Sequence, residues 1–302
     1  MSKDPHSQQD LMSFGYGFLG VLIFSLTLPA TRIAVTGFDP VFVGLGRAIV
    51  AAGLSLILLL VTRQKMPPAR FFPNFAIVAG GVVIGFPLLS AIAMRDAAAA
   101  HGAVITGILP LATALCGVWR AGERPSPQFW LFACLGSTLV ICFALLSGGG
   151  AMKWADLAMF GAVGAAALGY AEGAVLSRTF GSWQVICWSL LLSAPLLLPI
   201  VWQHAPANFF AVAPKPMLGF LYVSVFSMFL GFFAWYRGLA LGGIARVGQL
   251  QLVQPFFTIF GSVVLLGERL TIDTIGFAIA VIICVALGKR TALATITGGD
   301  RG

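Results

Sequence analysis

Long apolar runs separated by short polar connections dominate the chain. A helix that crosses a membrane needs about 20 consecutive, mostly apolar residues. Runs of suitable length fit residues 14–36, 40–62, 74–94, 102–120, 128–147, 155–177, 183–202, 217–237, 246–266 and 271–288. The pattern therefore predicts an all-α integral membrane protein with ten transmembrane helices.

The composition supports lipid as the solvent for most of the chain. Of 302 residues, 59% are hydrophobic and only 9% are charged, whereas soluble globular domains carry about 25% charged residues. The connections are too short to hold a separate soluble domain. In a soluble protein the net charge of +8 would suggest a nucleic-acid partner. Here we interpret it as loop charge facing the cytoplasm, and we expect no nucleic acid to bind.

The lysine and arginine residues of the connections predict the orientation. Cytoplasmic loops of membrane proteins are enriched in these residues, and a cytoplasmic N-terminus places most of them on the cytoplasmic side. Both termini are therefore predicted to be cytoplasmic, as polar tails at residues 1–13 and 289–302. The first apolar run is too long for the core of a secretory signal peptide, so we expect an uncleaved first helix.

One stretch of the sequence occurs twice. Pro110, Thr113, Val118, Gly122, Glu123 and Arg124 match Pro255, Thr258, Val263, Gly267, Glu268 and Arg269 at a constant spacing. The match indicates an internal duplication, with five-helix repeats at residues 14–147 and 148–288. Because five is an odd number, the second repeat must cross the membrane in the inverted sense. Inverted repeats are typical of secondary transporters, whose substrate binds near the bilayer midplane between the repeats. We therefore expect a central cavity there.

The two repeated helices each carry a stripe of small polar residues on one face, since residues three or four apart share a helix face. One stripe comprises Thr106, Pro110, Thr113 and Gly117, and the other comprises Gln251, Pro255, Thr258 and Ser262, with Gln254 beside it. Polar groups that face lipid are costly, so both stripes should face protein or water. A substrate pathway between the repeats and a polar seam between packed helices both fit this pattern.

Two charged residues fall well inside predicted helices. Arg47 lies about two turns into its helix, where a charge should face the bundle interior or a watery cavity. It could hold helices together or attract an anionic group such as a carboxylate. Glu172 could bind a proton and couple transport to it, or it could bond to a neighbouring helix. Arg32 is predicted toward the opposite membrane face from Glu172, so we do not expect these two residues to form an ion pair.

Other residues complete the candidate substrate contacts. Tyr170 and Trp235 could stack on an aromatic cargo, while Thr106, Ser227 and Gln251 could bond its polar end. Bending or close packing of helices is expected at Pro29, Gly85, Pro87, Pro110, Gly117 and Pro255. Proline removes a backbone hydrogen bond, and small residues let helices approach closely.

The sequence shows no constellation for catalysis or metal binding. The five cysteines lie inside predicted helices without metal-ligand spacing, and the three histidines lie at or outside the membrane edges. No phosphate-binding loop of the pattern G-x-x-x-x-G-K-[ST] occurs. We therefore expect no cofactor, no metal and no enzymatic activity. The expected partners are a small-molecule substrate and the lipid bilayer.

The two halves, each with Pro, twelve residues and then Glu before a last helix, resemble the EamA-type members of the drug/metabolite transporter superfamily. The likeness is strongest in residues 91–124 and 240–269. The overall sequence is similar to the YddG-type exporters of aromatic and other neutral amino acids. The resemblance implies ten helices around a central cavity. It also implies export of a small molecule from the cytoplasm across the bacterial inner (plasma) membrane, by alternating access without ATP.

The alternative function is a proton-coupled drug or metabolite antiporter that uses Glu172. The small four-helix multidrug exporters carry a glutamate in their first helix. Residues 14–36 contain no counterpart of it, so the resemblance does not extend to their form of proton exchange.

Overall fold

The computed structural model describes residues 5–122, 127–147 and 152–298, and these ranges are helical apart from short connections. The first half contains α1 Pro5–Ser25, α2 Thr27–Ala34, α3 Pro40–Val61, η1 Ala69–Phe71, α4 Phe72–Val78, η2 Ala79–Gly85, α5 Phe86–Asp96, α6 Ala99–Thr106, α7 Leu109–Ala121 and α8 Pro127–Ser147. The second half contains α9 Trp154–Phe180, α10 Ser182–Gln203, η3 Phe209–Ala211, α11 Pro214–Leu221, η4 Tyr222–Leu230, α12 Gly231–Gly242, α13 Ile244–Gly248, η5 Gln249–Val253, α14 Gln254–Leu266 and α15 Ile272–Gly298. The all-α prediction is confirmed for these residues.

Eight stretches of helix in the described residues are long and apolar enough to cross a membrane. They are Gln9–Ala34, Pro40–Val61, Ala69–Asp96, Ala99–Ala121, Trp154–Phe180, Ser182–Gln203, Pro214–Gly242 and Arg246–Leu266. Each coincides with one of the predicted helices. α8 and α15 occupy the positions of the other two, and that these two helices also cross the membrane stays a prediction.

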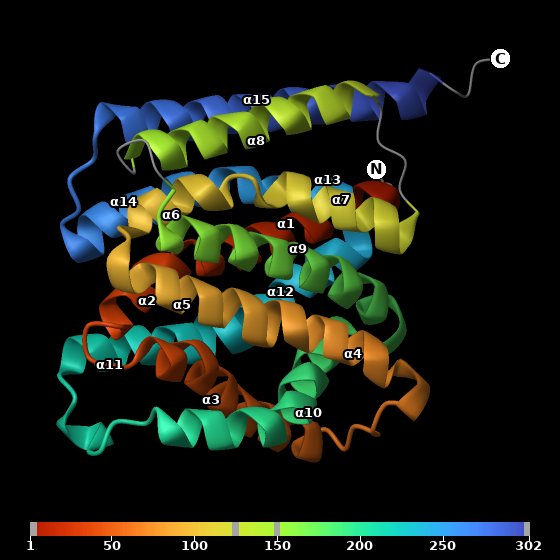
Figure 1. Ribbon diagram of the computed structural model, residues 1–302. Coiled ribbons are helices and arrows are strands. Elements are labelled where there is room, and N and C mark those ends of the chain that lie inside the picture. The colour runs from red at the N-terminus through yellow and green to blue at the C-terminus, as the bar shows by residue number, and fades with distance from the viewer. Residues whose placement is uncertain (1–4, 123–126, 148–151, 299–302) are drawn as a thin grey trace.

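The first helix of each half packs against the other half. α1 lies along α12, α13 and α14, whereas α9 lies along η2, α5 and α7 (Figure 1). The backbones touch where glycines meet. A Cβ on Gly81 would lie 2.8 Å from the Cα of Gly169, and a Cβ on Gly238 would lie 2.7 Å from the backbone nitrogen of Gly17. Small residues permit this close approach, so the first helix of each half lies among helices of the other half.

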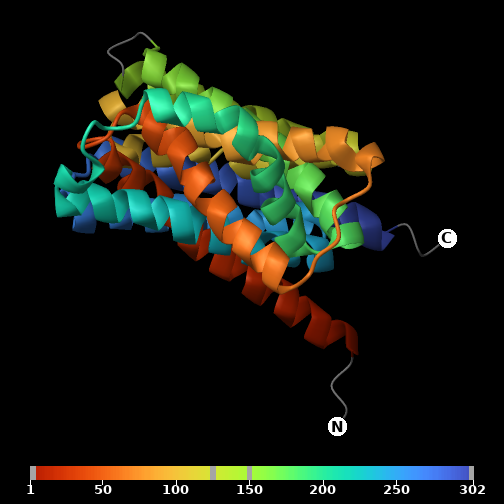
Figure 2. The same ribbon diagram turned by 90° about the horizontal axis from the view of Figure 1, so that it is seen from below.

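The remaining long helices form two pairs at opposite edges of the molecule. α8 packs on α15 along the upper edge in Figure 1, and α3 packs on α10 on the face nearest the viewer in Figure 2. α1 begins and α15 ends at the same end of the bundle, whereas the junction between α5 and α6 lies at the opposite end (Figure 1). The two pairs flank a central layer of helices.

Three predicted helices are interrupted on the N-terminal side of a proline. α1 ends four residues before Pro29, and α6 ends four residues before Pro110. The helix that contains Pro255 is tightened into the 3-10 segment η5 just before that proline. Proline lacks an N–H, and its ring clashes with the carbonyl four residues earlier. Each helix is therefore interrupted or tightened just before its proline, and the size of the expected bend stays a prediction.

Gly122 and Gly267 end α7 and α14 in the left-handed conformation, with φ of 69° and 66°. Glycine adopts this conformation without the steric penalty of a side chain, which is why it commonly follows a helix. The predicted helix exits at these two glycines are confirmed. Glu123 and Arg124 lie outside the described residues.

Candidate functional site

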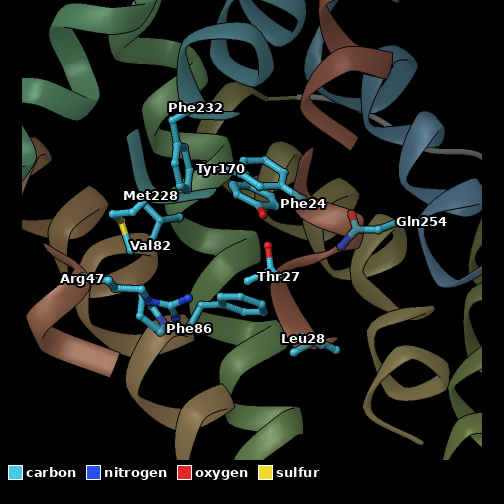
Figure 3. A pocket seen from close by; sticks show the side chains of 11 residues that line it. Phe24, Thr27, Leu28, Arg47, Val82, Phe86, Tyr170, Met228, Phe232 and Gln254 are labelled. Atoms are coloured by element: carbon cyan, nitrogen blue, oxygen red, sulfur yellow. The ribbon is translucent and has the colours of Figure 1, made fainter. Parts of the chain in front are cut away.

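A small cavity lies at the centre of the helix bundle (Figure 3). Its lining residues are Phe24, Thr27, Leu28, Arg47, Val82, Phe86, Pro87, Tyr170, Met228, Phe232 and Gln254. They come from the region where α1 meets α2, from α3, α5, α9, α12 and α14, and from the π-helical segments η2 and η4. Both halves of the chain therefore build the cavity. Single π-helical turns are frequent at functional sites, and here two such segments reach the same cavity.

Arg47 is the only charged residue among those that line the cavity. Its side chain is 1% exposed. Its Nη2 donates to the Ser90 Oγ at 3.5 Å, beyond the usual range of about 2.7–3.2 Å, and its Nε has no hydrogen-bond partner. None of the ion pairs found in the described part of the chain includes Arg47. An ionisable residue in this position within a membrane is a candidate for a functional role, and which role Arg47 plays stays a prediction.

Three aromatic rings form one wall of the cavity. Phe24 stacks on Tyr170 with ring centroids 6.2 Å apart, and it lies 5.1 Å from the ring of Phe232. Trp235 is fully buried next to this wall, with its ring centroid 5.5 Å from that of Tyr170. Aromatic pairs at these separations attract each other beyond simple burial. The rings therefore hold one another in place as an apolar wall, in which the Phe232 ring is tilted by 60° from Phe24 and by 57° from Tyr170.

A few polar groups lie close to the aromatic wall. The Thr27 hydroxyl lies 2.8 Å from the Ser227 hydroxyl, which links α2 to η4. The Gln254 amide points toward the cavity in Figure 3, and its buried Oε1 has no hydrogen-bond partner within the described residues. A buried polar group is stabilised only when it forms hydrogen bonds. The Gln254 amide can therefore serve a polar ligand.

The cavity is closed in this conformation. The space open to the centre of a water-sized sphere is about 20 Å³, which is room for about one water molecule. An amino acid does not fit into this volume. The cavity is lined by residues of both halves; that it is the substrate site between inverted repeats stays a prediction.

Arg32 and Glu268 hold together the end of the bundle opposite the termini. Glu268 accepts hydrogen bonds from the backbone N–H groups of Ala99 and Ala100 at 2.8 and 3.0 Å, and Arg32 donates to the last carbonyls of α5. These backbone groups have no partner within their own helices. Helix dipoles favour an anion at the N-terminus of α6 and a cation at the C-terminus of α5. The two side chains thus bind the α5–α6 junction from both directions.

Glu172 lies away from the cavity lining and is fully buried. Its Oε2 lies 2.5 Å from the Arg120 Nε, and its Oε1 accepts a hydrogen bond from the Asn74 amide. The contacts join α9 to α7 and α4. Arg32 does not pair with Glu172, as expected. Both carboxylate oxygens of Glu172 therefore have partners in this conformation, and proton coupling through Glu172 stays a prediction.

Some of the predicted site residues line the cavity, and others are buried elsewhere in the helix bundle. Arg47, Tyr170 and Gln254 line it, as does Pro87. The other predicted substrate-pathway residues, Thr106, Thr113, Ser227, Trp235, Gln251 and Thr258, are buried outside the lining. Both polar stripes therefore face protein rather than lipid. Which of these residues touch a substrate stays a prediction.

Sequence reasoning missed Phe24, Thr27, Phe86 and Phe232. A phenylalanine in an apolar run looks the same whether it faces lipid or a cavity, so the three rings carried no signal. Thr27 did carry one, because it lies two residues before Pro29, where a spanning helix was predicted to bend. A polar residue at a helix break is a candidate for a site, since the break frees backbone groups there.

Comparison with known proteins agrees with the sequence and the fold. The sequence model of the EamA-like transporter family matches residues 11–145 and again residues 153–288. A relative from Bacillus subtilis (strain 168), named Uncharacterized transporter YdeK, is 51% identical over 276 residues, which cover 91% of this chain and 96% of that protein. A solved crystal structure at 17% sequence identity shares the fold, with a TM-score of 0.67 over 92% of this chain and 98% of that one.

Proposed function

The chain belongs to the EamA-like transporter family, and we propose that it is a secondary transporter that exports small amphipathic metabolites across the bacterial inner (plasma) membrane. Aromatic and other neutral amino acids are the favoured cargo. The observation that carries this proposal is the central cavity, which both halves build from an aromatic wall and a few polar groups.

The chemistry of the lining suits such a cargo. An apolar or aromatic side chain would pack against Phe24, Tyr170 and Phe232, and burying it would supply most of the binding free energy. The polar end of the molecule would bond to groups such as the Gln254 amide. The resemblance to the YddG-type exporters adds support for amino acids.

The packing of the halves supports alternating access. The family model matches each half separately, as expected for a duplicated transporter with its substrate site between inverted repeats. We take α1, α2, η4 and α12 as one body and α9, η2, α5 and α7 as the other, with α6 packed on α14 and α7 packed on α13 beside them. The cavity lies where these bodies meet. We propose that they tilt against each other, so that the cavity opens first to the cytoplasm and then to the outside.

Purified protein in liposomes tests the proposed cargo. The liposomes are loaded with labelled phenylalanine or threonine, and release is compared with that from protein-free liposomes. We expect faster release with the protein present and no requirement for ATP. Release no faster than from protein-free liposomes, for every amino acid tried, would exclude amino acids as the cargo.

A bulky substitution in the lining tests the pathway. Met228→Trp places a larger side chain into the cavity and should abolish release while the protein still folds. Leu221→Trp, on an exposed position one residue before the same π-helical segment, is the matched control and should leave release unchanged. Full release by Met228→Trp would show that cargo takes another route.

A further inference from the structure

Arg47 stands apart from the other charged residues that the structure buries. The buried carboxylates Asp156 and Glu172 each lie beside a basic side chain, His101 and Arg120 respectively. Arg47 is equally buried, yet its one hydrogen bond, to Ser90, is long. Its environment therefore differs in kind from that of the buried acids.

A buried charge without a partner is expensive. Removing a guanidinium from water costs free energy that only a counter-charge or a full set of hydrogen bonds can offset. The cavity lining contains no Asp or Glu, so within the described chain no side chain of the lining supplies that counter-charge. The side chain also cannot reach the membrane surface, because it is enclosed between helices at the centre of the bundle.

The surroundings of Arg47 indicate what its partner is. Figure 3 places the Arg47 side chain on the side of the cavity away from the rings of Phe24, Tyr170 and Phe232. A guanidinium is a planar fork of N–H donors that matches a carboxylate with two parallel hydrogen bonds. A molecule with a carboxylate at one end and an apolar group at the other would satisfy both sides at once.

We propose that Arg47 binds the carboxylate of the cargo and thereby sets the substrate class. The site accepts carboxylate-bearing molecules, whether zwitterionic or anionic, and rejects molecules that carry only a positive charge. This inference rests on the proposed transport function, and it makes the class more specific. This preference also distinguishes the protein from an exporter of cationic drugs. A cation in the cavity would be repelled by Arg47, and the lining contains no carboxylate to attract it.

The test compares phenylalanine with phenylalaninamide, which keeps the ring and the amine but lacks the carboxylate. In liposomes, and after subtraction of release from protein-free liposomes, wild-type protein should release phenylalanine at least about tenfold faster than the amide. The amide cannot form the two parallel charged hydrogen bonds with the guanidinium, and tenfold corresponds to a loss of about 1.4 kcal/mol. Arg47→Gln should lose that preference. Ser55→Ala, which alters another buried polar residue of α3, should keep it. Equal release of the two compounds by wild type, or an undiminished preference in Arg47→Gln, would overturn the inference.

Ligand-induced stabilisation in detergent separates this inference from the transport proposal. A ligand that binds only the folded state raises the unfolding temperature. 3-Phenylpropionate should stabilise wild type, 3-phenylpropanol should not, and Arg47→Gln should lose the response. That result would support the carboxylate site even if no amino acid were transported. Arg47→Lys keeps a charge without the planar fork, so it decides the case if Arg47→Gln does not fold. A carboxylate preference that persists in Arg47→Lys supports the site, and a wild type that 3-phenylpropionate does not stabilise excludes it.

Discussion

Removing the Glu268 carboxylate should open the end of the bundle opposite the termini. Glu268 accepts two backbone hydrogen bonds, from Ala99 at 2.8 Å and from Ala100 at 3.0 Å. A hydrogen bond to a charged group contributes about 1.5–3 kcal/mol when it is well shielded, and the helix dipole adds roughly 0.3–1 kcal/mol. Glu268 is only partly buried, so we take about 2 kcal/mol for the whole contact after discounting for solvent.

A loss of about 2 kcal/mol corresponds to about a 30-fold shift in a two-state equilibrium. Glu268→Ala should therefore raise the population of the conformation open at this end by about that factor. Glu268→Gln can keep one of the two bonds through its amide oxygen, so its effect should be about fivefold. The effect should be smaller for Glu268→Gln than for Glu268→Ala, because each carboxylate oxygen accepts a hydrogen bond from a different N–H group.

Thiol accessibility of the cavity measures the shift. Leu28→Cys places a thiol in the lining, in a protein whose five native cysteines have been replaced. A membrane-impermeant thiol reagent is added on the side opposite the termini, and the labelling rate is compared among variants. Asp273→Ala removes another acid from the same surface hollow and should not change the rate. Equal labelling of the parent and Glu268→Ala would refute a role of Glu268 in closure, and an equal rise in Asp273→Ala would reveal a general charge effect.

Two further predictions concern stability and are read from unfolding temperatures in detergent. Arg120→Met should destabilise the protein by about 2–4 kcal/mol, because it leaves the fully buried Glu172 carboxylate without its cation. Glu172→Gln should destabilise it less, because the Arg120 side chain left behind is 27% exposed and can reach solvent. A larger loss in Glu172→Gln would contradict this order. Gly238→Ala should lower the unfolding temperature, since its Cβ would overlap the backbone of α1. Gly53→Ala, with no neighbouring atom within 4 Å of its Cβ, should leave it unchanged or raise it by the helix preference of alanine, about 1 kcal/mol. A tolerated Gly238→Ala would show that α1 and α12 can separate freely.

The sequence predicted the helices well because their causes are local. Apolar runs of sufficient length mark spanning helices, Pro29 and Pro110 interrupt helices through their own ring geometry, and Gly122 and Gly267 end helices through their own backbone freedom. Each of these effects acts within a few residues of its cause. A single sequence is therefore enough to locate them.

The packing partners of the helices were not predictable from a single sequence. Nothing within α1 or α9 specifies that each packs against the opposite half, because an apolar face fits many apolar surfaces. Most of the cavity lining was hidden for the same reason: Phe86 and Phe232 line the cavity only through the helices that surround them. Arg47 was the exception. Its charge within an apolar run is unfavourable unless the fold provides a place for it, so its position alone predicted that it faces the bundle interior, where the structure buries it.

The packing of the first helix on the second half also sets how early in biosynthesis that packing can form. Thr27 finds its partner Ser227 only after 200 more residues have been made, which takes roughly 10–40 s at typical rates of translation. During that interval α1 already lies in the membrane, while the helices that will cover its glycine and hydroxyl positions do not yet exist. The first helix of the protein therefore reaches its final packing only while the last third of the chain is being translated.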